Sequence, residues 1–400
     1  MGLRRFPQGR AGARAVLRAR ADRGDATSQP DATATSHLRS RSDQLASLES
    51  PVGSRCHDRR GGVTTSAPVG TGSTAPVFIV GCRRSGTTLV SRVVDAHPAF
   101  SVYHESFLYP IFRSEVRWYG DLRAPANLAR LVADVREVLA TQISDVPAPE
   151  AIREAMQQAS LSGVFGALLQ LHARREGKRR GGDKTPEHHR YLDDIQRDFP
   201  ASPVVFTMRD PRDTVLSIRR LFDASVEGAA QVWRRAYESY REHANGVHLM
   251  RYESLAREPE VEVRRLCAVL AEPFEPTMLE FHRHLPDDFR RPGGEKLSGP
   301  IDASAVGQFR TMPGSELRVI EAVCGEGMEA LGYEFVAGGG ALGTVIAAPR
   351  QRRWRWVVDR LRYYGANRRR WQRGAARWKV MARVRLRWLL GRTARPEERV

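Results

Sequence analysis

The chain has 400 residues, a formal net charge of +18 and four cysteines. The cysteines form no C-x-x-C pair, which argues against a disulfide scaffold or a structural zinc site and fits a reducing compartment. No run approaches 18 apolar residues and the first 20 residues lack an apolar core, so neither a transmembrane helix nor a secretory signal is predicted. We therefore expect a cytoplasmic protein.

The positive charge is concentrated at the two ends of the chain. Residues 1–75 have a net charge of +6 and residues 345–400 of +15, which leaves −3 for residues 76–344. Residues 1–74 are poor in large apolar side chains, so they cannot bury enough surface to offset chain entropy. We predict a disordered extension over 1–74, one folded domain over 75–344 and a basic tail over 345–400.

A strand, a glycine-bounded turn and a helix start follow one another at residues 76–95. Val77–Val80 is an uninterrupted apolar run, typical of a strand buried on both faces of a parallel sheet. The turn Gly81–Gly86 has the Walker A spacing, but Thr87-Thr88 stands in place of Lys-Ser/Thr. Backbone N–H groups and a helix dipole converge on such a turn, which predicts an anion site. Because the lysine that reaches the β- and γ-phosphates is missing, we expect a ligand other than a nucleoside triphosphate.

The rest of the body alternates helical and extended patterns. A helical insertion, a usual place for acceptor recognition, is predicted from helical patterns at 107–119, 126–142, 148–160 and 162–176. Further strands are predicted near 180–183, 203–208 and 247–251, with helices between them. The alternation predicts an α/β fold with a P-loop-like parallel sheet flanked by helices. Residues 284–312 show little periodicity and are expected to form a lid or binding loop.

Six motifs follow one another along this body. They are R-S-G-T-T-L (Arg84–Leu89), D-A-H-P (Asp95–Pro98) with a later Glu105, G-D-K-T-P (Gly182–Pro186), V-V-F-T-M-R-D-P-R-D-T-V-L-S (Val204–Ser217), R-Y-E-S-L (Arg251–Leu255) and L-G-Y (Leu331–Tyr333). Together they resemble the sulfotransferases that use 3′-phosphoadenosine-5′-phosphosulfate (PAPS), above all the tyrosylprotein sulfotransferases and the related bacterial group. Order and spacing are kept across all six motifs, which makes the resemblance more specific than any one of them.

The resemblance implies a set of contacts to PAPS as co-substrate, with no metal expected. The 5′-phosphosulfate loop would consist of Arg84, Ser85, Gly86, Thr87 and Thr88. Arg209 and Ser217 match the pair that binds the 3′-phosphate, and Tyr252 matches another nucleotide contact. Arg209 also ends an apolar strand, at the edge where α/β sheets bind ligands. Asp210 resembles a Walker B carboxylate, but the implied chemistry gives it no metal to bind.

The resemblance also assigns the catalytic groups. Glu105 matches the general base, since a carboxylate can accept the proton of an acceptor hydroxyl. His104 is the competing base, because related cytosolic sulfotransferases use a histidine. Lys184 matches the lysine that stabilises the transferring group. Its alternative is a solvated lysine that precedes a helix begun by Thr185-Pro186.

The chain departs from the family pattern in its later part. A family arginine aligns with Leu221, although Arg219 and Arg220 are close. Relatives have a cation and an aromatic near residue 308, whereas this chain has Gln308-Phe309. A serine that assists catalysis in the tyrosylprotein enzymes falls near Gly293, where Ser298 is a possible replacement. A protein tyrosine is therefore not implied as the acceptor.

The tail combines arginine clusters with aromatic residues. Trp371, Trp378, Val380, Met381, Val384 and Trp388 continue an apolar stripe at helical spacing. A basic amphipathic helix with tryptophans is typical of peripheral anchors on anionic lipid, here at the inner face of the membrane. Packing on the protein's own body and contact with an acidic polymer or nucleic acid are the alternatives.

The function favoured by these patterns is transfer of a sulfuryl group from PAPS to a hydroxyl on a carbohydrate, lipid or small molecule. Two alternatives remain. A P-loop kinase or NTPase would have the same loop architecture, but this chain lacks the lysine after Gly86 with which such an enzyme binds ATP. A non-catalytic nucleotide or acidic-surface binder would not need Glu105, Lys184 and Arg209 together. Nucleic acid is not an expected partner of the body.

Overall fold

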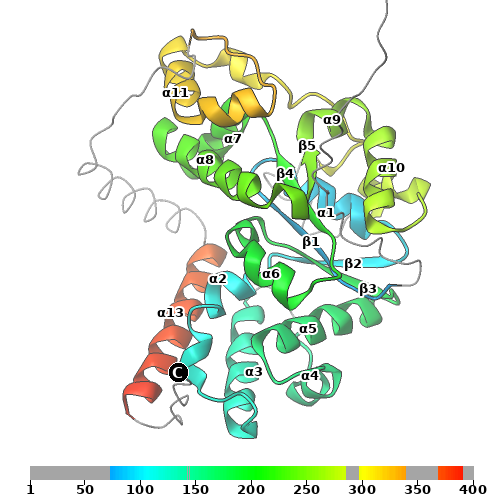
Figure 1. Ribbon diagram of the computed structural model, residues 1–400, viewed down its shortest axis with the longest axis vertical. Helices are drawn as coiled ribbons and strands as arrows, with labels where there is room; N and C mark the ends of the chain where they lie inside the picture. Colours follow the sequence, from blue (N-terminus) through cyan, green and yellow to red (C-terminus); the bar gives the residue numbers. More distant parts are fainter. Residues whose placement is uncertain (1–72, 142, 144, 285–296, 339–367, 391–400) are drawn as a thin grey trace, which may run out of the picture. The chain divides into compact units, whose positions relative to one another are not determined.

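In the described part of the chain, the fold is built on five short parallel strands. The computed structural model describes residues 73–141, 143, 145–284, 297–338 and 368–390. The strands are β1 (Val77–Gly81), β2 (Phe100–His104), β3 (Arg180–Lys184), β4 (Val204–Met208) and β5 (His248–Arg251). They pair in the order β2-β3-β1-β4-β5, and every pairing is parallel (Figure 1). The predicted α/β fold with a parallel sheet is thus confirmed, and β1 lies at its centre.

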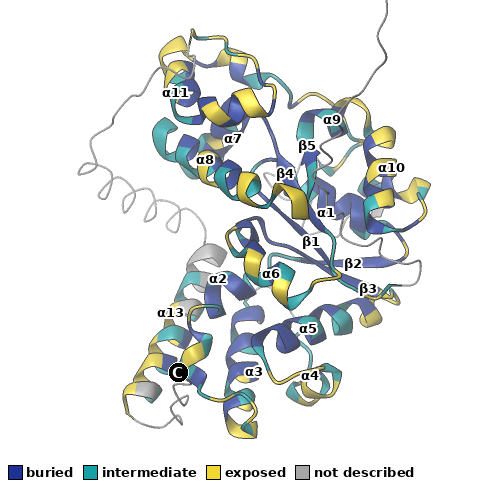
Figure 2. Ribbon diagram, in the orientation of Figure 1, coloured by how far each residue is buried: buried dark blue, intermediate teal, exposed yellow. Residues whose placement is uncertain are grey.

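Two hydrophobic cores cover the two faces of this sheet. Phe78 and Val80 of β1 belong to one core, whereas Val77 and Ile79 belong to the other. This split follows from the strand geometry, because successive side chains point to opposite faces. Strands β1, β3 and β4 are buried throughout, as the continuous apolar run of β1 predicts, whereas the edge strand β5 is half-buried (Figure 2).

Helices flank the sheet on both sides and form the predicted insertion between β2 and β3. The insertion contains α2 (Leu108–Phe112), η1 (Val116–Tyr119), α3 (Pro125–Leu139), α4 (Pro149–Ala155) and α5 (Leu161–Arg175). The other elements of the body are α1 (Thr87–Asp95), η2 (Pro186–Tyr191), α6 (Leu192–Asp198), α7 (Pro211–Phe222), α8 (Val226–His243), η3 (Ala244–Gly246), α9 (Tyr252–Arg257), α10 (Pro259–Leu270), η4 (Pro276–Met278), η5 (Phe281–His284), η8 (Gln308–Thr311) and α11 (Gly314–Ala330). Helix α13 (Arg368–Leu389) lies in the tail.

Strand β3 has the unusual sequence R-G-G-D-K, and all five of its residues are buried. Its glycines are needed for close approach. A Cβ at Gly181 would lie 2.4 Å from the carbonyl oxygen of Leu169 in α5, and one at Gly182 would lie 2.6 Å from Val77 in β1. The glycines therefore let β3 sit tightly between its neighbours, which brings Lys184 next to the central strand.

The two ends of the chain are described only in part. The predicted disordered extension lies outside the described residues except for 73 and 74, and so does the tail between 345 and 367.

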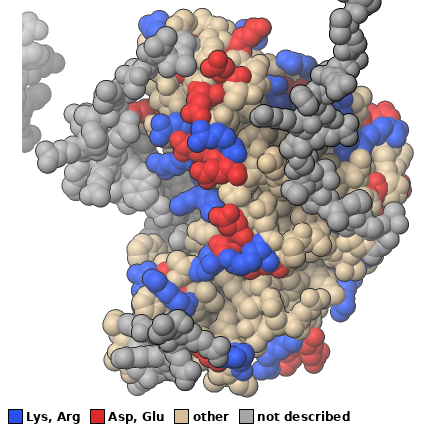
Figure 3. All heavy atoms as spheres, viewed as in Figure 1, with Lys and Arg blue, Asp and Glu red and all other residues tan. Residues whose placement is uncertain are grey.

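Among the described residues, no helix has both the length and the apolar character needed to cross a bilayer. Figure 3 shows cationic and anionic side chains interspersed over the visible surface, in keeping with the nearly neutral body.

Candidate active site

The predicted phosphate loop joins β1 to α1 and contains two left-handed residues, Arg84 (φ 69°) and Gly86 (φ 90°). A Cβ at Gly86 would lie 2.6 Å from the ring of Tyr252, so only glycine allows this aromatic ring to pack against the loop. Among the described residues no side chain caps α1, and its first turn has no acidic residue. The positive end of the helix dipole is therefore directed at the loop, as an anion site requires.

Two buried side chains of the loop behave differently. The Ser85 hydroxyl is buried, and its oxygen has no nitrogen or oxygen hydrogen-bond partner among the described residues. Such a group is costly unless a ligand or water satisfies it. Burial raises the pKa of the Cys82 thiol to about 12. Cys82 is thus a packing residue without the thiolate character that redox chemistry needs.

Four of the predicted nucleotide residues meet beside this loop. The Arg84 Nε donates a hydrogen bond to the Ser217 hydroxyl over 3.2 Å, which links the loop to α7. The Arg209 guanidinium lies over the Tyr252 ring, 4.7 Å from its centroid. We call Arg209, Tyr252 and Ser217 the clamp. The buried Arg209 Nε has no hydrogen-bond partner among the described residues, so the clamp retains a donor for an anion.

Asp213 contacts the clamp and was not singled out from the sequence. Its buried carboxylate lies 3.3 Å from Arg209 Nη2 and accepts hydrogen bonds from the backbone N–H groups of Gly307 (2.7 Å) and Phe309 (2.8 Å). Arg209 also donates to the Ala305 carbonyl. The later part of the predicted lid, 297–312, is therefore attached to the clamp. Gly293 lies outside the described residues.

The two predicted catalytic residues form an ion pair. Lys184 Nζ lies 2.8 Å from Glu105 Oε1, and the lysine side chain is fully buried while 24% of the glutamate side chain is exposed. The alternative of a solvated lysine is therefore wrong. Burial lowers the pKa of Lys184, and the Glu105 carboxylate opposes this shift. A desolvated ammonium beside a partly exposed carboxylate can act on a reacting group that enters from the exposed side.

The turn that contains Glu105 has a strained backbone and is hydrogen-bonded to the end of β3 and the residue after it. Glu105 and Phe107 have φ values of 61° and 55°, a region that costs non-glycine residues about 1–3 kcal/mol each. The backbone N–H of Glu105 donates to the Lys184 carbonyl (2.8 Å), that of Ser106 to Asp183 Oδ2 (3.2 Å) and that of Phe107 to Thr185 Oγ1 (3.4 Å). Three consecutive residues, 183–185, therefore fix the orientation of Glu105.

Asp183 has a second partner. Its Oδ1 lies 2.9 Å from His188 Nδ1, and both side chains are fully buried. Neither residue was given a role from the sequence. The available signal was the motif D-K-T-P, in which the acid and the threonine flank the lysine.

Asp210 has a structural role. Its side chain accepts a hydrogen bond from the Arg212 backbone N–H, which caps α7, and it forms an ion pair with the Arg212 guanidinium at 2.7 Å. In the described part of the chain, no three His, Cys, Asp or Glu side chains are grouped so that they could hold a metal ion.

All these groups follow the carboxyl ends of the strands. The register places His104 of β2 opposite Lys184 of β3, and Met208 of β4 opposite Arg251 of β5. The phosphate loop begins directly after β1, between these two pairs. An ion pair of Arg83 with Glu187 further joins the loop to the segment after Lys184. One edge of the sheet thus holds the loop, the clamp and the Glu105–Lys184 pair, as is general for ligand sites in α/β sheets.

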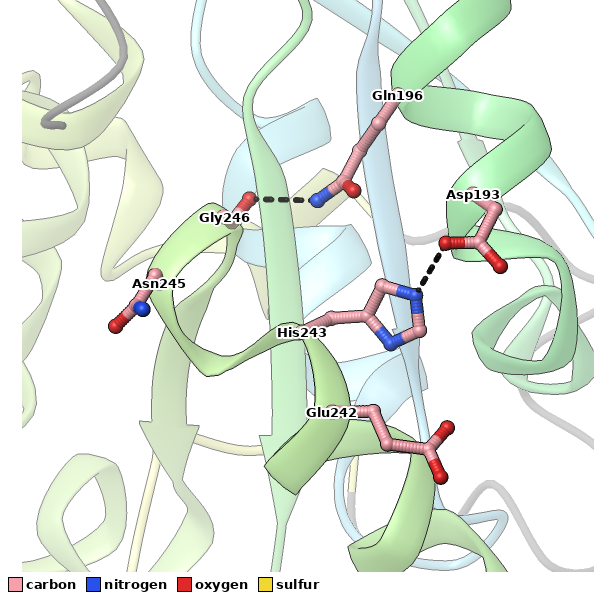
Figure 4. Close-up of a pocket in the computed structure, with 6 residues that line it drawn as sticks. All are labelled: Asp193, Gln196, Glu242, His243, Asn245 and Gly246. Atoms are coloured by element: carbon pink, nitrogen blue, oxygen red, sulfur yellow. Dashed lines mark hydrogen bonds and ion pairs between the residues drawn. The ribbon is translucent and has the colours of Figure 1, made fainter.

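A separate open pocket lies toward the amino ends of the strands (Figure 4). It is lined by Asp193, Gln196, Glu242, His243, Asn245 and Gly246. Its residues pair among themselves, with His243 Nε2 3.0 Å from Asp193 Oδ1 and Gln196 Nε2 3.3 Å from the Gly246 carbonyl oxygen. It contains none of the predicted site residues.

Comparison with known proteins identifies the family. A model described as the sulfotransferase family matches residues 76–276, half of the chain, and this segment contains every predicted site residue. The chain belongs to the sulfotransferase family. The predicted resemblance is thereby confirmed.

Curated relatives share about a quarter of the residues in the segments that they match. The protein-tyrosine sulfotransferase of Drosophila melanogaster is 26% identical over 320 residues, which cover 74% of this chain and 57% of that protein. The nodulation protein NoeE of Sinorhizobium fredii is 27% identical over 143 residues, which cover 36% of this chain and 30% of that protein. The chain thus spans just over half of the first relative and under a third of the second.

Two solved structures align with parts of this chain at low TM-scores. A sulfotransferase domain from the curacin biosynthetic pathway aligns with a TM-score of 0.45 and 21% identity, over 66% of this chain and 99% of that domain. A retinol dehydratase in complex with androsterone and the inactive cofactor PAP aligns with a TM-score of 0.31 and 14% identity, over 69% of this chain and 83% of that one.

Proposed function

We propose that this protein transfers a sulfuryl group from PAPS to a hydroxyl on a carbohydrate, lipid or small molecule. The observation that carries the proposal is the meeting of the phosphate loop, the clamp and the Glu105–Lys184 pair at one sheet edge. The donor set suits PAPS. The loop offers an uncapped helix N-terminus and the Ser85 hydroxyl, and Arg209 offers a buried N–H. Such donors suit a ligand with anionic groups at two positions.

Each half of PAPS has its own contacts in this proposal. Loop residues 84–88 bind the 5′-phosphosulfate, and Arg209 with Ser217 binds the 3′-phosphate. The hydrogen bond between Arg84 and Ser217 places the two sets side by side. The loop also lacks the lysine that a triphosphate would need.

Glu105 and Lys184 perform the transfer. The acceptor oxygen forms a bond to sulfur while the bond between sulfur and the bridging oxygen of the 5′-phosphate breaks. Glu105 takes the proton of the acceptor hydroxyl as general base. The Lys184 ammonium stabilises the negative charge that develops on the bridging oxygen. Because this charge develops only as the bond breaks, the interaction favours the transition state over the ground state and so accelerates the transfer.

Calorimetry with two nucleotides tests the proposal. Adenosine 3′,5′-bisphosphate should bind without metal and more tightly than ATP, with and without Mg²⁺. Equal affinity or a strict Mg²⁺ requirement would contradict sulfuryl transfer and favour the kinase or NTPase alternative. Transfer of labelled sulfate from PAPS to a panel of carbohydrate, lipid and small hydroxyl acceptors then separates an enzyme from a non-catalytic binder.

A further inference from the structure

Helix α13 is fastened to the body by one of its sides. Val380 and Val384, one turn apart, are buried in the same core as the helices of the insertion. Arg383 pairs with Asp134 and Glu137 of α3, and Arg385 pairs with Glu115, next to η1, at 2.9 Å. This side of α13 therefore packs on the protein's own body, which was one of the alternatives for the tail.

The opposite side of α13 is apolar and exposed. Trp378, Leu386 and Leu389 recur at helical spacing, and 69%, 56% and 71% of their surfaces are exposed. Leu390 follows them and is exposed as well. The three other large apolar residues exposed in the described part of the chain are single valines on other segments, Val261, Val319 and Val336. Clustered exposure of this kind marks an interaction surface, whereas scattered valines do not.

This exposed side corrects the apolar stripe predicted from the sequence. The stripe combined residues from both sides, because Val380 and Val384 face the body whereas Trp378 faces away from it. The side chains of Trp371 and Trp388 lie outside the described ones. The surface that can meet a partner therefore consists of Trp378, Leu386, Leu389 and Leu390.

The charge of α13 decides which partner fits. Its 22 residues include nine Lys or Arg and no acid. Three carboxylates of the body pair with Arg383 and Arg385, while Lys379 is exposed beside Trp378. A second copy of the chain would bring the same excess of cations against this helix, which opposes self-association through this side. An anionic lipid surface complements both the cations and the apolar side chains.

We propose that the exposed side of α13 docks this protein on an anionic membrane surface. Trp378, Leu386 and Leu389 enter the headgroup region, and the exposed Lys379 next to Trp378 contacts the lipid charges. Because the opposite side is held by buried valines and ion pairs, docking fixes the insertion, and with it the catalytic body, at the surface. Helix α13 acts as part of the domain.

Vesicle flotation of the full-length protein tests this surface. The wild type should float with vesicles of phosphatidylcholine and phosphatidylglycerol but not with phosphatidylcholine alone. The variant Trp378→Ser/Leu386→Ser/Leu389→Ser should lose about tenfold or more in partitioning. Its matched control, Val261→Ser/Val319→Ser/Val336→Ser, removes three exposed apolar side chains elsewhere and should float like the wild type. Unchanged melting and bisphosphate binding would show that both variants are folded.

Four results would overturn the proposal. They are equal flotation on neutral vesicles, unchanged flotation of the α13 variant, no flotation of the wild type, and a wild-type dimer that the α13 variant abolishes. The last would assign the surface to a second copy. Binding to polyphosphate by a protein that ignores anionic vesicles would assign it to an acidic polymer.

Discussion

The two halves of the site lie at neighbouring strand ends and are built in different ways. The donor half, formed by the phosphate loop and the clamp, spreads its charge over a helix N-terminus and two arginines. The acceptor half depends on one buried ion pair and on a turn with two left-handed residues. Binding should therefore weaken step by step as contacts are lost, whereas transfer should fail sharply when a single group changes.

The sharpest test of this contrast is Glu105→Gln. Turnover should fall by about 10²-fold or more, the usual contribution of a general base, because the amide cannot accept the acceptor's proton. Affinity for adenosine 3′,5′-bisphosphate should stay nearly unchanged in calorimetry, since no nucleotide contact is assigned to Glu105. Glu260→Gln, an exposed glutamate of α10, serves as the control. If His104→Ala abolishes turnover and Glu105→Gln does not, the roles of the two residues are reversed.

Arg209→Ala tests the donor half. Losing a charge-assisted contact to the 3′-phosphate should weaken bisphosphate binding by about 2 kcal/mol, or about 30-fold. Arg264→Ala removes an exposed arginine that pairs with Glu260 and should leave the affinity unchanged. Unchanged affinity in Arg209→Ala would mean that the clamp is wrongly assigned.

Asp183→Asn tests whether the strained turn matters for catalysis. The substitution keeps the shape of the side chain but removes the anionic partner of the Ser106 N–H and of His188. We expect turnover to fall about tenfold through misplacement of Glu105, with bisphosphate affinity unchanged. The exposed Asp193–His243 pair offers a matched control in Asp193→Asn. An equal loss of affinity and turnover would indicate general destabilisation.

The smallest expected effect is the dependence of turnover on pH, which reports on Lys184 in the acceptor half. Burial lowers the pKa of Lys184 below the ordinary 10.5, so its ammonium is lost at a lower pH than in a solvated lysine. Turnover should therefore fall as the pH rises through this lowered pKa.

Stability should change in the opposite direction over the same range. Between the lowered folded pKa and 10.5 the unfolded chain binds the extra proton, so the contribution of Lys184 to the free energy of unfolding rises with pH. Comparison with Lys184→Met in pH-dependent denaturation isolates this contribution. Parallel curves for the two proteins would argue that Lys184 keeps its ordinary pKa.

The same contrast explains what could be predicted from the sequence. The donor half is encoded in contiguous motifs, and Arg209 ends a strand that its apolar run identifies. The sheet was predicted except for β2, whose sequence F-S-V-Y-H lacks a continuous apolar run. Glu105 follows this strand, so its place came from the family resemblance alone.

Long-range contacts account for the residues that were missed. Asp183 holds a backbone N–H 77 residues away, and Asp213 holds one 94 residues away. Local patterns report which strands and helices form, but they do not report which backbone donor a buried carboxylate will meet. The left-handed backbone at Glu105 and Phe107 is likewise imposed by β3, because neither residue type favours it.

The attachment of α13 has a consequence for the order in which the protein is completed during synthesis. The contacts of Arg383 with Asp134 and of Arg385 with Glu115 join residues 249 and 270 positions apart. At about 5–20 residues per second, roughly 12 to 55 seconds separate the translation of these partners. During that interval the carboxylates of Asp134 and Glu115, buried in the finished protein, have no cations from α13. The helical insertion, which is translated early, therefore gains its contacts with α13 only after most of the chain has been translated.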